Sequence, residues 1–205
     1  MDFTKEQFIN FWGSNGYYEE FTYGIGIDKV IERTIVPFGG NYKNCLEIGC
    51  GGGVFTKVLS EQFGYVFGID VIPEHRGVKY NNVIYTELDN QDYKCTGVDD
   101  NSIDFVFSYG VFCHFSNDAI KEYLQSIYRV LKKGGHCVIM ISNFDKLKEQ
   151  FPDFDDWGKY KLGDRMLIGH FYQDDRTVDI MKHKFKIVSR NLTPDHRDIV
   201  VHLKK

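Results

Sequence analysis

A glycine-rich stretch, Leu46 to Gly53, is the first part of the sequence that could support chemistry. It follows a short apolar run and precedes a helix-like pattern. Glycines at such a place let the backbone turn tightly and let a ligand come close to the amide groups. A helix that starts there adds unpaired N–H donors. The stretch therefore predicts a binding site for a nucleotide-like ligand.

Two residues, Val54 and Glu47, bear on the kind of ligand. Dinucleotide-binding turns follow the pattern G-x-G-x-x-G/A. When this pattern starts at Gly49, Val54 stands where the third glycine or alanine is required. Glu47 stands just before the turn, where a carboxylate would disfavour a pyrophosphate but would tolerate a cationic sulfonium and amino group. A glycine-rich turn without any ligand is the alternative interpretation.

Asp70 ends a second apolar run. It follows the glycine turn by about 20 residues, the spacing at which a ribose-binding acid is expected. A carboxylate at this position can accept hydrogen bonds from both ribose hydroxyls. A single Asp after a strand can also be a solvated turn or a cap, but the register with the glycine turn favours the ribose contact.

Short apolar runs alternate with helix-like patterns from Asn44 onward. Such runs, joined by crossover helices, are typical of a parallel sheet that is covered on both faces. The predicted strands are Cys45–Ile48, Tyr65–Ile69, Val83–Glu87, Ile103–Ser108, His136–Ile141, Phe185–Asn191 and Asp198–Leu203. The predicted helices are Thr4–Phe11, Ile27–Ile35, Gly53–Phe63, Asn117–Leu131 and Arg176–His183.

The last two predicted strands are joined by a short connection that contains Pro194, so we expect them to be antiparallel neighbours. The fold class is therefore α/β, a doubly wound and mostly parallel sheet with helices on both faces. We expect a single domain over residues 1–205. Its parts are an N-terminal helical cap or lid (1–43), a cofactor-binding core (44–142), an acceptor-site insert (143–173), and a C-terminal helix with an antiparallel strand pair (174–205).

Several motifs, in this order along the chain, resemble those of the class I S-adenosylmethionine-dependent methyltransferases of the small-molecule type. The resemblance covers about Asn44 to Ile141 and extends weakly to the C-terminus. Lys133 departs from the family pattern, which has proline there, and the segment from Asp92 to Asp99 is long. The matching motifs are Leu46–Gly53, Asp70, Leu88–Tyr93, Asn101–Ser108 and Tyr128–Gly135.

The resemblance implies a Rossmann-like, seven-stranded sheet of order 3-2-1-4-5-7-6 with strand 7 antiparallel. It also implies that S-adenosylmethionine is the cofactor and S-adenosylhomocysteine the product. The turn at Lys132–Gly135 is expected to be structural, ending a helix with glycine. The implied cofactor-binding residues are Glu47, Gly49, Cys50 and Gly51 on the methionine and ribose side, Asp70 at the ribose, Val71, Ile72, Asp89 and Asn90 at the adenine, and Ser108 and Tyr109 beside the methionine.

His114 is the candidate catalytic residue. Methyl transfer from a sulfonium is an in-line displacement in which the enzyme mainly aligns the reacting atoms and removes water. An amine or hydroxyl acceptor can still need a base, and histidine suits that role near neutral pH. A packing or helix-start role for His114 is the alternative.

The acceptor site is expected beyond the carboxyl ends of the strands, where ligands bind in this kind of fold. The insert after the fifth strand should cover it, and an Arg and a His there could hold a phosphate or carboxylate. A solvated lid is the alternative for the insert. Surface packing is the alternative for two tyrosines near the N-terminus, Tyr17 and Tyr23. The candidate substrate-binding residues are Tyr17, Trp157, Arg165, His170 and Tyr172, and Tyr23 is a further candidate for the cofactor.

The composition limits the partners. A net charge of −4 and a pI of about 6.0 argue against nucleic-acid binding. The five cysteines show no zinc-site spacing, and no carboxylate set for a metal is apparent, so no metal is expected. We also expect no membrane segment, a cytoplasmic location with reduced thiols, and a monomer or homodimer.

These observations predict a methyltransferase that acts on oxygen or nitrogen of a small metabolite, such as a sugar, a nucleotide-linked sugar or a phosphorylated compound. Two alternatives remain. One is a protein or RNA methyltransferase that works with a partner subunit, and the other is a non-catalytic subunit that binds S-adenosylmethionine. Only residues at the acceptor site can separate the three.

Overall fold

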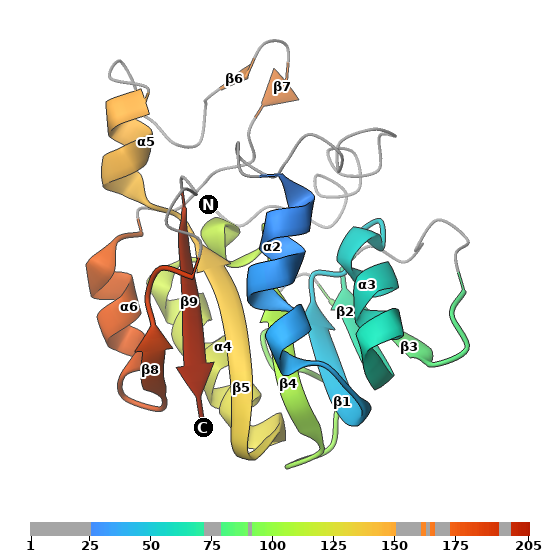
Figure 1. Cartoon of the computed structure of the whole chain (residues 1–205). Helices are drawn as coiled ribbons and strands as arrows, with labels where there is room; N and C mark the ends of the chain where they lie inside the picture. The colour runs from blue at the N-terminus through green and yellow to red at the C-terminus, as the bar shows by residue number, and fades with distance from the viewer. Residues whose placement is uncertain are drawn as a thin grey trace.

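A computed structural model describes residues 26–71, 79–89, 92–150, 161–162, 165–166, 173–192 and 198–205. Its centre is a seven-stranded sheet of order β3-β2-β1-β4-β5-β9-β8 (Figure 1). This order is the predicted 3-2-1-4-5-7-6, since β8 and β9 are the sixth and seventh strands of the sheet. The strands are β1 (Gly40–Ile48), β2 (Phe63–Asp70), β3 (Val83–Glu87), β4 (Ile103–Ser108), β5 (Leu131–Ile141), β8 (Lys186–Ser189) and β9 (Ile199–Lys204).

The strand directions confirm the predicted fold class. Strands β1 to β5 pair in parallel, whereas β9 is antiparallel to both β5 and β8. The predicted antiparallel neighbours at the end of the chain are therefore confirmed. The carboxyl ends of β1 to β5 all lie at the upper edge of the sheet in Figure 1, so the residues that follow these strands meet at one edge.

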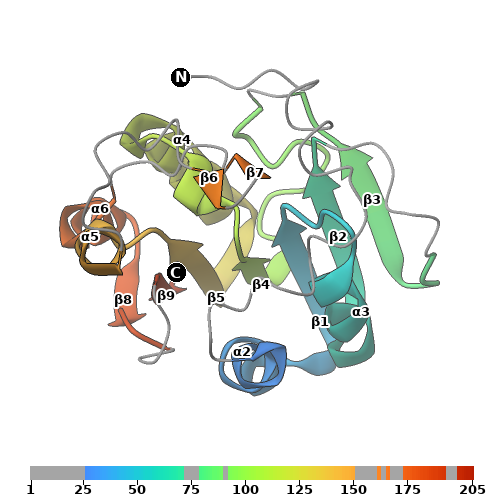
Figure 2. The same ribbon diagram turned by 90° about the horizontal axis from the view of Figure 1, so that it is seen from above.

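Helices cover both faces of the sheet, as Figure 2 shows from above. One face carries α2 (Ile27–Thr34) and α3 (Val54–Gln62), and the other carries α4 (Asn117–Val130) and α6 (Asp175–Met181). Side chains alternate between the faces along each strand. Leu46 and Ile48 therefore belong to the buried cluster under α4 and α6, whereas Cys45 belongs to the cluster under α2 and α3.

The end of α4 differs from the prediction. The helix ends at Val130, and β5 begins at once with Leu131. Gly134 has φ of +81°, and its N–H donates to the carbonyl of Lys205 at 3.0 Å. The pairing register between β4 and β5 shifts in this part of β5. The expectation that this glycine ends a helix is therefore wrong, because the glycine pair forms an irregularity within β5.

Some elements were not predicted at all. They are the short 3-10 helices η1 (Val36–Phe38) and η2 (Phe112–His114), the helix α5 (Phe144–Gln150), and the two-residue strands β6 (Lys161–Leu162) and β7 (Arg165–Met166). Among the described residues, no helix is both long and apolar enough to cross a bilayer. All five cysteines lie in the described part of the chain, where they are buried and free of disulfides.

Candidate functional site

The glycine turn, Asp70 and Ser108 meet at the carboxyl edge of the sheet. They follow or end β1, β2 and β4, which are neighbours in the sheet. The buried hydroxyl of Ser108 donates to the carbonyl of Ile48 at 2.8 Å, just before the turn. Ser108 therefore ties the end of β4 to the start of the turn.

Gly49 occupies a position that no other residue can fill without strain. Its φ is +77°, in the left-handed region that favours glycine. A Cβ atom there would lie 2.0 Å from Cγ2 of Val111, so the segment after β4 packs directly on the turn. The Gly49 N–H donates to the carbonyl of Ile69 at 2.8 Å, which fixes the turn to the end of β2.

Asp70 is bonded to the glycine turn. Its Oδ2 accepts a hydrogen bond from the N–H of Gly51 at 2.7 Å, and its carbonyl accepts from the N–H of Leu88 at 2.7 Å. The side chain is half-buried. The carboxylate is thus oriented by the turn at the edge of the sheet, and the sequence alone did not indicate that contact.

Glu47 is a buried acid on the α3 side of the sheet. Only 3% of its surface is exposed, and its Oε2 accepts a hydrogen bond from Oγ1 of Thr56 in α3 at 2.5 Å. Burial raises the pKa of Glu47 to about 8, the Thr56 hydrogen bond lowers it, and the charge of Asp70 raises it further. The acid is therefore protonated at neutral pH in the free protein, and a nearby cation would favour its ionised form.

This pKa leads to a prediction about the ligand-free protein. Between pH 4.5, the ordinary pKa, and about pH 8, the folded state binds more protons than the unfolded state. The contribution of Glu47 to stability is therefore complete below that window and is lost as the pH rises through it, by at most about 1.4 kcal/mol per pH unit. We expect Glu47→Gln to remove this dependence in urea unfolding measured from pH 5 to 9.

The difference between the two stability curves is the quantity to analyse. His202, whose pKa is lowered to about 4 mainly by burial, also titrates with folding, but it is present in both proteins. Its contribution cancels in the difference. Parallel curves for the wild type and Glu47→Gln would contradict the raised pKa.

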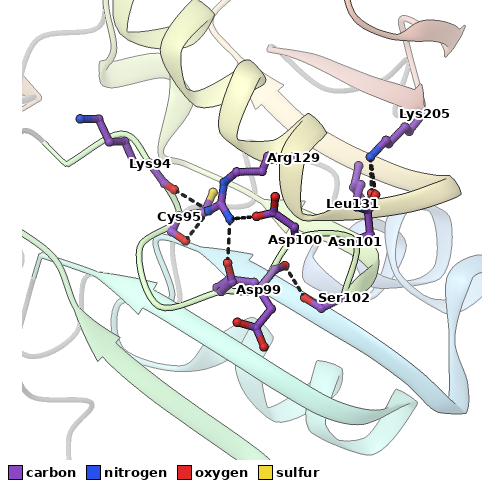
Figure 3. A network of polar contacts seen from close by, with 10 residues as sticks. Lys94, Cys95, Asp99, Asp100, Asn101, Ser102, Arg129, Leu131 and Lys205 are labelled. Carbon is purple, nitrogen blue, oxygen red and sulfur yellow. Dashed lines mark hydrogen bonds and ion pairs between the residues drawn. The ribbon is translucent and has the colours of Figure 1, made fainter.

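The segment after β3 is held by Arg129 of α4 (Figure 3). The guanidinium donates to the carbonyls of Val98 at 3.0 Å and Lys94 at 3.2 Å, and it pairs with the carboxylate of Asp100. This segment follows Leu88 and Asp89, and Asp89 is one of the residues predicted at the adenine. Leu88 is buried and Asp89 is exposed. Arg129 thus fixes the segment that leads from the end of β3 to the start of β4.

Tyr109 and His114 follow β4. The Tyr109 ring packs on Phe55 of α3 with their centroids 5.1 Å apart. His114 is half-buried and ends the short helix η2, and its N–H donates to the carbonyl of Val111 at 2.9 Å. His114 therefore lies in a turn, not at the start of a helix, and the same turn contacts Gly49 through Val111.

The structure brings part of the predicted site together. The residues after β1, β2 and β4 are adjacent, and Cys50 and Val71 lie within the same edge, buried and half-buried respectively. Arg165 belongs to the short strand β7. The remaining predicted positions lie outside the described residues: Tyr17, Tyr23, Ile72, Asn90, Trp157, His170 and Tyr172.

Three residues that hold the site or the segments leading from it were missed from the sequence. Thr56, Arg129 and Gln173 each make polar contacts between distant segments. Thr56 and Arg129 lie inside helical patterns and Gln173 lies at the boundary of the insert, so none of them carries a local signal.

Comparison with known proteins adds to this geometry. A family described as "Methyltransferase domain" matches residues 46–139. Phosphoethanolamine N-methyltransferase 1 of Triticum aestivum is 31% identical over 111 residues, which are 50% of this chain and 22% of that protein. The corresponding protein of Zea mays is 30% identical over 109 residues, or 50% and 21%. The matching part of the chain thus spans about a fifth of these relatives.

Solved structures share the fold over nearly the whole chain. The N-methyltransferase NodS from Bradyrhizobium japonicum WM9, in complex with S-adenosyl-L-homocysteine, superposes with a TM-score of 0.70 at 14% identity and covers 98% of this chain and 97% of its own. An S-adenosylmethionine-dependent methyltransferase from Aquifex aeolicus gives 0.65 at 17% identity, with 98% of each chain covered. At these identities the likeness extends to the fold only.

Proposed function

We propose that the chain, which resembles methyltransferase domains over residues 46–139 and shares their fold, binds S-adenosylmethionine and transfers the methyl group to a small phosphorylated amine. The observation that carries the cofactor assignment is the pair of acids beside the glycine turn. Glu47 lies buried beneath it, and Asp70 is bonded to Gly51 within it.

The charge of these acids fits the proposed cofactor. The electrostatic influence of Asp70 adds to burial in raising the pKa of Glu47, so simultaneous ionisation of the two acids is disfavoured in the ligand-free protein. A ligand with a sulfonium and an ammonium group would favour the ionised form of both acids, whereas a pyrophosphate would be repelled by the charge of Asp70. S-adenosylhomocysteine bound to the structurally similar NodS supports the same choice.

The proposed residue roles follow from position. Asp70, held by the Gly51 N–H, would accept hydrogen bonds from the ribose, and Asp89, just after β3, would border the adenine. The cofactor would supply a methyl group already activated by a positively charged sulfur. The chain itself would align the acceptor and exclude water.

The acceptor assignment rests on the curated relatives, which are named for methylating phosphoethanolamine. An amine acceptor is an ammonium ion at neutral pH and must lose a proton before its nitrogen can attack. We propose His114 as the group that takes this proton, because it lies in the turn that contacts Gly49. The phosphate of such an acceptor would require a cationic partner at the same edge.

A transfer assay tests the acceptor. The full chain is incubated with methyl-labelled S-adenosylmethionine and either phosphoethanolamine or phosphocholine, which has the same phosphate but no nitrogen lone pair. We expect label in phosphoethanolamine and none in phosphocholine. Ethanolamine, which lacks the phosphate, should react at least about tenfold more slowly, as expected for the loss of one charged contact.

Two results would count against this proposal in different ways. If S-adenosylhomocysteine binds but phosphoethanolamine is not methylated, the acceptor class is wrong and the cofactor assignment stands. If ethanolamine and phosphoethanolamine are methylated at equal rates, the protein does not recognise the phosphate group.

A further inference from the structure

Gln173 has a fully buried side chain beside the turn that carries His114. It lies just before α6 and has no exposed surface. Its Oε1 accepts from the N–H of Ser142, after β5, at 2.8 Å. Its Nε2 donates to the carbonyls of Phe112 and Phe115, each at 2.7 Å. One amide group therefore joins the end of β5 to both ends of the η2 turn.

The main chain strengthens the same junction. The N–H of Phe144 donates to the carbonyl of Gln173 at 3.0 Å, and the hydroxyl of Ser142 approaches the carbonyl of Cys113 at 3.4 Å. Buried polar groups that lose their partners are costly, so these bonds hold firmly. Only an amide of this length supplies both the acceptor for Ser142 and the two donors for the turn.

The turn held by Gln173 is also pinned on its other side. The rings of Phe112 and Phe115 pack against Tyr123 of α4, with centroids 5.3 Å from it in both cases. Val111 fills the space beside Gly49. His114 thus lies between two carbonyls that are fixed by the same side chain, on a turn that contacts the glycine turn.

We infer that Gln173 is a positioning residue, which holds the η2 turn so that His114 keeps a fixed place relative to the glycine turn. This inference rests on the proposed function for the role of His114. The structural half, that Gln173 orders the turn, does not depend on the identity of the acceptor.

Gln173→Glu separates the two sides of the junction. The glutamate keeps an oxygen for Ser142, but even when protonated it offers one O–H donor where Nε2 supplies two, so at least one of the two carbonyls loses its partner. We expect the amides of residues 112–116 to exchange with deuterium at least about tenfold faster than in the wild type. The affinity for S-adenosylhomocysteine should stay within about threefold, because the glycine turn and Asp70 are unchanged.

The catalytic readout is methyl transfer to phosphoethanolamine. Gln173→Glu should lower kcat at least about tenfold and change the pH dependence of kcat. His114→Ala should have the same two effects. The double variant should have a kcat only slightly lower than that of either single variant. A purely structural role would lower cofactor affinity and kcat together and would leave the shape of the pH profile unchanged.

Thr177→Val is the matched control. Thr177 lies in α6 only a few residues away, is equally buried, and its hydroxyl donates to the side chain of Asn117 at 3.0 Å. This variant loses a buried polar contact without touching the turn, so exchange at 112–116 and the kcat pH profile should match the wild type. Gln173→Met, an apolar side chain of similar length, provides a second variant if Gln173→Glu does not fold.

The exchange measurement and the kinetic measurement test different parts of the inference. Unchanged exchange at 112–116 in both Gln173 variants overturns the inference, whatever the acceptor. Faster exchange with an unaltered kcat also overturns it, because the turn would then not position a reacting group. If the wild type does not methylate phosphoethanolamine, the proposed acceptor fails, and the exchange measurement alone decides whether Gln173 orders the turn.

Discussion

Gly49→Ala is expected to remove detectable cofactor binding and to destabilise the free protein. An alanine at φ of +77° costs about 1–2 kcal/mol. Its Cβ would also lie 2.0 Å from Cγ2 of Val111, and overpacking of this kind costs about 1–3 kcal/mol. Val111 is β-branched and has few other rotamers. The total is about 2–5 kcal/mol, to be measured by urea unfolding together with calorimetric titration of S-adenosylhomocysteine.

Gly134→Ala is the control for backbone strain. Gly134 has φ of +81°, close to that of Gly49, but a Cβ there meets nothing within 4 Å. It lies near the amino end of β5, at the opposite edge of the sheet from the glycine turn. Gly134→Ala should therefore show only the backbone cost and bind the cofactor normally. Equal destabilisation of the two variants would show that Val111 yields without cost and that the turn is not tightly packed.

Asp70→Ala is expected to weaken the binding of S-adenosylhomocysteine by about 1–3 kcal/mol, which is roughly 5- to 150-fold in affinity. The variant loses the carboxylate that would accept from the ribose. It also loses the acceptor for the Gly51 N–H, so the glycine turn becomes less well ordered. Calorimetry measures the affinity, and thermal unfolding measures the cost to the free protein.

Two variants separate these effects. Asp70→Asn keeps an oxygen for the Gly51 N–H but removes the charge, so its affinity should fall between those of the wild type and Asp70→Ala. Asp104 accepts from the N–H of Asn44 at 2.9 Å, at the opposite end of the sheet. Asp104→Ala should therefore lower stability while leaving the affinity unchanged. An unchanged affinity in Asp70→Ala would reject the ribose assignment.

The fold could be predicted closely because the apolar runs that form the sheet are sharply bounded. The bounds of β3 and β4 match the prediction exactly as Val83–Glu87 and Ile103–Ser108. The start of β1 was placed too late, since its first residues are partly polar and exposed and gain strand pairing through Gly40 and Phe63. Hydrophobic periodicity does not report such a contact with a neighbouring strand.

The glycine turn and Asp70 could be located from the sequence because both depend on local chain chemistry and on spacing. The roles of Thr56, Arg129 and Gln173 could not. Each depends on a partner in a different segment, such as the carbonyls of Phe112 and Phe115 for Gln173, 61 and 58 residues away. Long-range contacts of a polar side chain leave no periodic pattern, so only the folded chain reveals them.

The most direct test of the central claim is a calorimetric comparison of two ligands on the full, unmodified chain. Both S-adenosylhomocysteine and NAD carry an adenosine, but only NAD brings a pyrophosphate to the acidic glycine turn. We predict that S-adenosylhomocysteine binds at one site per chain and that NAD does not bind at the same concentration. Binding of NAD in preference to S-adenosylhomocysteine, or binding of neither ligand, would contradict the account.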